Sequence, residues 1–153
     1  TNGFREAMAA AGVTKEVPMF EMKQFTAEES FKFAQDMITA NSDLRAIFIQ
    51  TDSAAVGAQR AVRAARKTED IIVAAFDGTP ELYDLIKDGK ILGSGMQQPY
   101  LMGFKAAEAL ASHLGGNTVE NEILLPILVG TTDNVGELGD EINLNVFAGE
   151  LTR

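Results

Sequence analysis

The sequence predicts an α/β protein built on a Rossmann-like parallel sheet with helices on both faces. Two observations carry this prediction. Short apolar runs alternate along the chain with amphipathic stretches, and several of the amphipathic stretches open with clear helix-start signals. The resulting order of strand, helix, strand, helix calls for right-handed crossovers and therefore for a parallel sheet covered by helices. With 153 residues, the chain has the length of one ordinary domain.

Three apolar runs are short and bounded by polar residues, as buried strands are. They cover residues 45–50, 71–76 and 91–97, the last weakened by Gly93 and Gly95. An earlier segment at 17–22 alternates more and carries Pro18, so we expect it to be an edge strand.

The helices between these strands begin and end at residues that are typical of helix termini. Thr26 and Glu29 form the pattern of a capping box ahead of an apolar stripe at Phe31, Ala34 and Ile38. A second helix is expected over 55–65 and a third after Thr79-Pro80. Pro99 opens a fourth, which Gly115-Gly116 ends.

The last part of the chain is less regular. Residues 123–129 are expected to form an apolar strand interrupted by Pro126. Residues 130–153 are acidic and only patchily apolar, which indicates an irregular tail with one short strand at 142–147.

Composition excludes much of enzymology. The chain has no Cys and a single His, His113, so thiolate metal sites, disulfides and His-rich metal centres are excluded, and we expect no metal and no cofactor. The 22 acidic and 13 basic residues give a net charge of -9, which argues against nucleic acid or an anionic membrane as a partner. No apolar run approaches the roughly 18 residues of a membrane span.

In an open parallel sheet, ligands bind beyond the carboxyl ends of the strands. The residues at those ends are polar or aromatic: Gln24, Phe25, Thr51, Asp52, Asp77 and Gln97. They contain no acid–base pair and no activated nucleophile, which disfavours an enzyme. Carboxylate and amide groups can hydrogen-bond vicinal hydroxyls while a ring stacks on a sugar, so the set favours a polyol ligand.

Each of these residues also has a structural interpretation. Asp77-Gly78 can simply make a turn, Asp52 can cap the following helix, and Phe25 can act as a hydrophobic staple before Thr26. The lone His113 lies on a helix, where a solvated or packed histidine is the ordinary outcome.

Taken in order, several segments resemble the ribose-type periplasmic binding proteins, with their two-lobe fold. The similar stretches are Ala46 to Ala58 around Thr51-Asp52, Ala75-Phe76-Asp77-Gly78-Thr79-Pro80, Ile86 to Lys90, Met96 to Gly103 around Gln97-Gln98-Pro99, and Thr132-Asp133-Asn134-Val135. The resemblance covers about residues 2 to 135.

The resemblance implies that residues 1–97 form the C-terminal ligand-binding lobe without its start. It further implies that 98–122 cross over and pack on an N-terminal lobe missing from this chain, and that 123–153 form a hinge strand and tail. Phe25 would stack on the sugar, while Asp77 and Gln97 would bind its hydroxyls. Thr51 stands where the family usually has Asn, which weakens the case for ribose in particular.

By the same resemblance, the protein would be the sugar-binding component of an ABC importer, delivering a monosaccharide to a membrane permease without entering the membrane itself. It would lie in the periplasm, or outside a Gram-positive cell on a lipid anchor. The alternative is the effector domain of a LacI-type transcription regulator, which shares the fold. A response-regulator-like domain is a more distant alternative, because the strand ends offer no Lys beside the acidic residues.

Overall fold

The chain is built on one four-stranded sheet. In the computed structural model, which describes residues 2–13 and 15–149, the strand order is β1-β2-β3-β4. Strands β1 (Ala46–Phe48), β2 (Ile72–Asp77) and β3 (Gly93–Met96) are parallel, and β4 (Leu128–Thr131) runs antiparallel to β3. The three predicted central strands are confirmed, and β4 makes the sheet mixed rather than wholly parallel.

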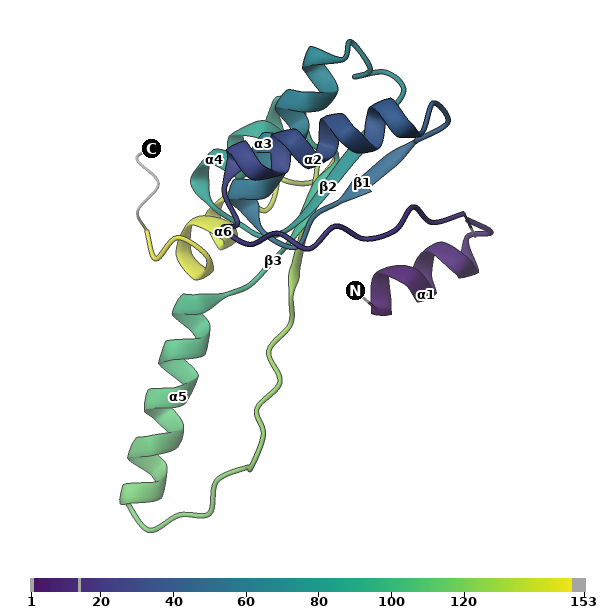
Figure 1. Cartoon of the computed structure of the whole chain (residues 1–153). Helices are drawn as coiled ribbons and strands as arrows, with labels where there is room; N and C mark the ends of the chain where they lie inside the picture. Colours follow the sequence, from purple (N-terminus) through teal and green to yellow (C-terminus); the bar gives the residue numbers. More distant parts are fainter. Residues whose placement is uncertain (1, 14, 150–153) are drawn as a thin grey trace.

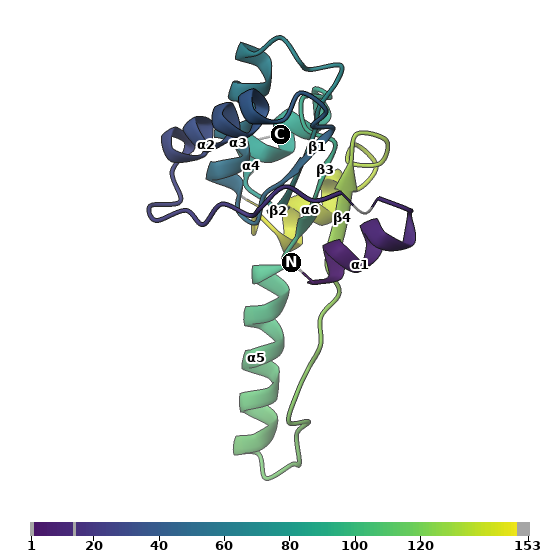
Figure 2. The same cartoon turned by 45° about the vertical axis from the view of Figure 1, so that its right-hand side comes forward.

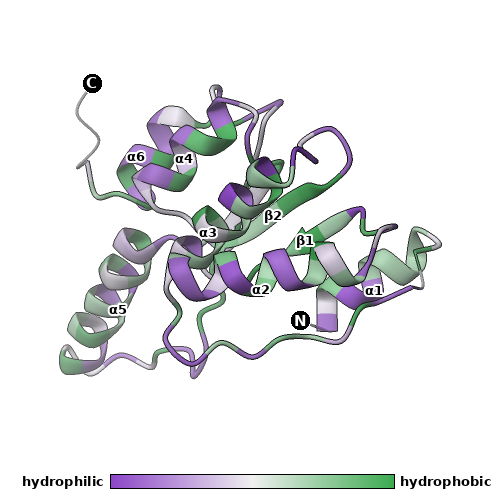
Figure 3. Cartoon of the chain, turned by 45° about the horizontal axis from the view of Figure 1, so that its top comes forward, coloured by the Kyte–Doolittle hydropathy of each residue, from purple (hydrophilic) through white to green (hydrophobic). Residues whose placement is uncertain are grey.

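One face of the sheet carries the hydrophobic core. Helices α2 (Ala27–Ala40), α3 (Asp52–Ala64), α4 (Pro80–Lys87) and α6 (Gly139–Asn145) supply the buried side chains that join those of the strands. Figures 1 and 2 show α2, α3 and α4 gathered on one side of the strands. The hydropathy colouring in Figure 3 shows apolar β1 and β2 beside helices of mixed character, as the predicted amphipathic pattern requires.

The predicted helix starts are confirmed. The hydroxyl oxygen of Thr26 accepts a hydrogen bond from the Glu29 amide at 3.2 Å, and that of Thr79 accepts one from the Leu82 amide at 3.3 Å. These caps satisfy amides that have no partner within the first turn of a helix. The two caps directly follow Phe25 and Gly78, so α2 begins just after Phe25 and α4 just after the turn at Asp77-Gly78.

The opposite face of the sheet is covered sparsely. Helix α1 (Asn2–Ala10) reaches it through Phe4, whose ring stacks on Phe48 with centroids 4.4 Å apart. Ile72 and Val129 lie on the same face and remain 50% and 59% exposed. Helices thus contact both faces, as predicted, but α1 covers only the end at β1.

The prediction of an edge strand at 17–22 is wrong. The segment is extended but makes no strand pairing. A strand forms only where a neighbouring strand pairs with it, and none of the four strands in the described residues pairs with 17–22. The alternation of apolar and polar residues shows that a segment is suited to a strand, but it does not show whether another strand lies beside it.

Two predictions for the last part of the chain need correction. The strand expected at 123–129 begins only after Pro126, as β4, because proline has no amide to donate to a ladder. The short strand expected at 142–147 is wrong, since this region lies at the end of α6. Ile142 and Val146 are four positions apart and both face the core, which is helical spacing.

Helix α5 (Pro99–Leu114) projects away from the sheet as an arm (Figure 1). No residue of α5 is buried, and its main contact is with α6. Several large apolar side chains on this arm and on the returning segment are exposed: Tyr100, Met102, Phe104, Leu110, Leu114, Ile123 and Leu124. The helix does not fold back onto its own sheet.

Candidate ligand-binding site

Asp77 and Gln97 meet at the carboxyl ends of two neighbouring parallel strands. Asp77 ends β2, and Gln97 directly follows β3. The Gln97 Nε2 donates a hydrogen bond of 2.5 Å to Asp77 Oδ1. This bond orients both side chains and leaves Asp77 Oδ2, together with the Gln97 oxygen, available to a ligand.

The backbone at Asp77 is unusual. Its φ is +110°, and that of Gly78 is +115°. A residue with a side chain in this region costs about 1–3 kcal/mol, so surrounding contacts have to hold it there. Glycine is required at 78 because a Cβ there would lie 2.8 Å from Met96 Cγ. The turn therefore brings the Asp77 carboxylate to the end of the sheet in a fixed, strained conformation.

A pocket of about 280 Å³ adjoins the two side chains. Its lining combines the polar pair with an apolar wall: Asp77, Gly78, Gln97, Pro99, Met102 and Val146. The apolar part comes from the first turn of α5 and from the end of α6. Hydroxyl-binding groups beside an apolar wall suit a ligand that has both hydroxyls and C–H faces.

Thr51 and Phe25 lie outside this lining. Thr51 is the N-cap residue of α3 and makes no side-chain capping bond, so its hydroxyl is not committed to the helix. It directly precedes Asp52, which contacts the turn at Gly78. Phe25 is 60% exposed just before α2, which argues against the staple interpretation.

The loop before α2 is held by Glu29. Its carboxylate accepts backbone hydrogen bonds from Lys23 (2.9 and 3.1 Å) and Gln24 (2.8 Å) rather than completing a capping box. These bonds lower the pKa of Glu29 below its usual value. They also brace the segment that leads into Phe25, whose φ of +53° is unfavourable for an aromatic residue.

Two polar residues beside the site have partners that the sequence does not predict. The Asp52 carboxylate accepts the Gly78 amide, at 3.1 and 3.0 Å. Gln98 is almost fully buried; its Nε2 donates to the Pro126 carbonyl oxygen at 2.7 Å, and its Oε1 accepts from Asn145 Nδ2 at 2.9 Å. Gln98 thereby joins the outgoing and returning segments of the arm to α6. The partners of Asp52 and Gln98 lie 26 or more positions away in the sequence, so no local sequence pattern predicts these contacts.

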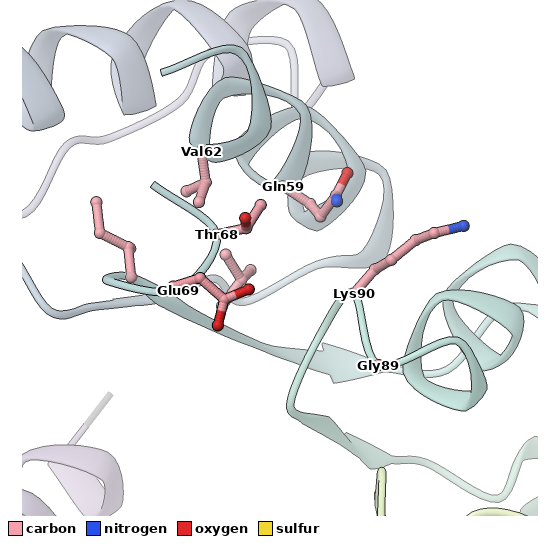
Figure 4. Close-up of a pocket in the computed structure, with 8 residues that line it drawn as sticks. Gln59, Val62, Thr68, Glu69, Gly89 and Lys90 are labelled. Atoms are coloured by element: carbon pink, nitrogen blue, oxygen red, sulfur yellow. The ribbon is translucent and has the colours of Figure 1, made fainter. Parts of the chain in front are cut away.

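A second cavity, of about 150 Å³, lies near the beginning of β2 rather than at its carboxyl end (Figure 4). It is lined by residues of α3, of the turn before β2, and of the turn after α4, including Gln59, Glu69 and Lys90. None of the predicted site residues borders it. Within residues 2–13 and 15–149, no three acidic or imidazole side chains gather where they could hold a metal ion.

The same described ranges contain no helix with the length and apolarity needed to cross a membrane. The most apolar exposed helix, α5, has 16 residues.

Comparison with known proteins identifies the fold. Residues 1–118 match the model of the periplasmic binding protein domain. The ribose import binding protein of Salmonella typhimurium is 35% identical over 118 residues, which are 77% of this chain and 39% of that protein. The D-ribose/D-allose-binding protein of Pseudomonas aeruginosa is 30% identical over 122 residues, 80% of this chain and 38% of that protein. The chain thus spans about two fifths of the length of these relatives.

Solved structures with the same fold support the family match. A periplasmic ribose ABC transporter protein of Conexibacter woesei superimposes with a TM-score of 0.84 at 23% identity, over 91% of this chain and 47% of the other. A solute-binding protein of Agrobacterium vitis with bound D-fucose superimposes with a TM-score of 0.79 at 27% identity, over 92% and 48%. From its family match, its relatives and its fold, the chain belongs to the periplasmic binding protein domain family.

Proposed function

We propose that this chain is the C-terminal lobe of a two-lobe sugar-binding protein that serves an ABC importer. One observation carries the proposal: Asp77 and Gln97 are hydrogen-bonded to each other at the ends of adjacent parallel strands, beside a pocket with an apolar wall. A carboxylate and an amide held in this way offer paired hydrogen bonds to the neighbouring hydroxyls of a sugar. In this role the protein binds and releases its ligand unchanged and is not an enzyme.

The proposed ligand is a monosaccharide or a related polyol. The relatives support this class, since those compared above are named for ribose or allose or have D-fucose bound. In the proposed complex Asp77 and Gln97 bind hydroxyls, Phe25 stacks on the ring, and Thr51 adds a single hydroxyl contact. The alternative of a transcription regulator receives no support from the matched family model.

The arm supports the two-lobe arrangement. We propose that residues 1–97 form the ligand-binding lobe, that 98–122 cross to a second lobe, and that 123–153 return as hinge strand and tail. Helix α5 has no buried residue and carries exposed Phe104 and Leu110, which is costly unless another surface covers them.

The proposed cellular location follows from the proposed function in sugar import. A binding protein that delivers sugar to a membrane permease works in the periplasm, or outside the cell on an anchor in a Gram-positive source. The permease is its protein partner.

The experiment compares the full-length protein with the isolated 153-residue chain. Thermal-shift screening of the full-length protein against pentoses, hexoses and sugar alcohols should give at least one stabilising ligand, since a ligand at a hundredfold excess over its Kd stabilises by about 2.7 kcal/mol. Calorimetry with that ligand should give no tight binding to the isolated chain, because one lobe supplies only part of the contacts. Micromolar affinity in the isolated chain would contradict the two-lobe site.

A further inference from the structure

Asp52 is a buried carboxylate that the proposed sugar contacts do not use. It is only 4% exposed and is the first residue of α3. Its carboxylate does not cap its own helix. Both of its oxygens instead accept the amide of Gly78, 26 positions further along the chain, at 3.1 and 3.0 Å.

The bound amide belongs to the peptide unit that joins Asp77 to Gly78. The carbonyl oxygen of this unit accepts a hydrogen bond from the Gln97 amide at 3.0 Å, and its N–H donates to Asp52. Both polar ends of one peptide plane are therefore fixed, one by the strand end at β3 and the other by α3. That plane lies between the two residues with positive φ, so its orientation determines where the Asp77 side chain points.

The electrostatic surroundings of Asp52 act on its carboxyl group in two directions. Burial raises the pKa of its carboxyl group, and the nearby Asp77 carboxylate raises it as well. The Gly78 amide, with the hydroxyl and amide of Thr79, acts in the opposite direction by binding the charged form. Asp52 is therefore a buried carboxylate whose donors all belong to the turn at Gly78 and Thr79.

We propose that Asp52 is a positioning residue: by holding the Gly78 amide, it keeps Asp77 in its positive-φ conformation and aims the Asp77 carboxylate at the ligand. The part of this inference that concerns the ligand rests on the proposed function. The part that concerns the backbone does not.

The backbone is tested by NMR on the 153-residue chain. The coupling between the amide and α protons of Asp77 distinguishes a φ of +110° from an extended backbone. It should change in Asp52→Ala and stay close to the wild-type value in Asp52→Asn, which keeps one acceptor oxygen. Asp52→Ser, whose hydroxyl is too short to reach the Gly78 amide, replaces Asp52→Ala if that variant does not fold. Asp36→Ala, on the exposed face of α2, is the matched control.

Ligand binding is tested by a double-mutant cycle in the full-length protein. Asp52→Ala should weaken sugar binding at least tenfold when Asp77 is present, but less than twofold in an Asp77→Ala background, because Asp52 acts through Asp77. Asp52→Asn should stay within about threefold of wild type.

An unchanged Asp77 coupling in Asp52→Ala or Asp52→Ser would overturn the proposal. Equal losses of affinity in the two backgrounds would also overturn it, since they would reveal a general structural role. If no sugar binds the full-length protein, the proposed function fails, and the NMR result alone decides whether Asp52 positions Asp77.

Discussion

Replacing Asp77 by Ala removes the carboxylate on which the proposed site depends while keeping a Cβ in the same strained turn. Asp77 Oδ1 is shared with Gln97, which leaves Oδ2 and one further lone pair for sugar hydroxyls. Hydrogen bonds to a charged group contribute about 1.5–3 kcal/mol each, so at the lower end one bond is worth about tenfold in affinity and two bonds are worth about a hundredfold. The Kd for the sugar, measured by calorimetry on the full-length protein, should therefore rise at least about tenfold, and by about a hundredfold if both bonds form.

The backbone offers a matched control. Asp77→Gly also lacks the carboxylate, but glycine adopts a φ of +110° without a steric penalty. Both variants should lose the same affinity, while the ligand-free Asp77→Gly protein should be more stable than Asp77→Ala by about 1 kcal/mol. If Asp77 only closes a turn, the result inverts: Asp77→Ala leaves the affinity within about twofold of wild type, and the ligand-free protein loses stability. That outcome would refute the assignment of Asp77 to the ligand.

Three further changes test the supports of the site. Gly78→Ala would place a Cβ 2.8 Å from Met96 Cγ at a φ of +115°, so it should lower the free energy of unfolding by about 1–3 kcal/mol in urea titrations; an unchanged midpoint would contradict the strained turn. Gln98→Leu should lower the free energy of unfolding by about 1–3 kcal/mol in the same assay, because it leaves the Pro126 carbonyl and the Asn145 side-chain amide without their hydrogen-bond partner. An unchanged free energy of unfolding would mean that solvent replaces both bonds. Hydrogen bonds from backbone amides lower the pKa of Glu29, so its contribution to stability is complete above the ordinary Glu pKa of about 4.3 and is lost as the pH falls through the lower folded value. Glu29→Gln should therefore reduce the acid sensitivity of thermal unfolding, and a pH profile identical to wild type would contradict the role of this carboxylate.

Local features of the fold could be predicted because their causes lie within a few residues. Thr26 and Thr79 satisfy amides three positions ahead, and both helix starts were found. The apolar runs around β1, β2 and β3 are equally clear in the sequence, because each is short, rich in apolar residues and bounded by polar ones. The ends of those strands then identified Asp77 and Gln97, which the structure joins by a hydrogen bond.

Features that depend on distant partners could not be predicted. The 17–22 segment has the pattern of an edge strand but no neighbour within the described residues. The contact between Asp52 and Gly78 has no local signal in the sequence, because the two residues lie 26 positions apart. The strand expected at 142–147 is wrong for a different reason. A few apolar residues at mixed spacing fit both the helical and the strand period, and in the structure Ile142, Val146 and Phe147 join the core, with the Phe147 ring against Tyr83 of α4.

The assignment of Asp77 and Gln97 to the sugar is best tested by a crystal structure of the full-length protein with its ligand. We expect sugar hydroxyl oxygens about 2.5–3.0 Å from the Asp77 carboxylate and within hydrogen-bonding distance of Gln97, with the ring against the apolar wall formed by Met102 and Val146. A sugar bound elsewhere, for example in the cavity beside Gln59 and Lys90, with Asp77 and Gln97 contacting only each other, would contradict it.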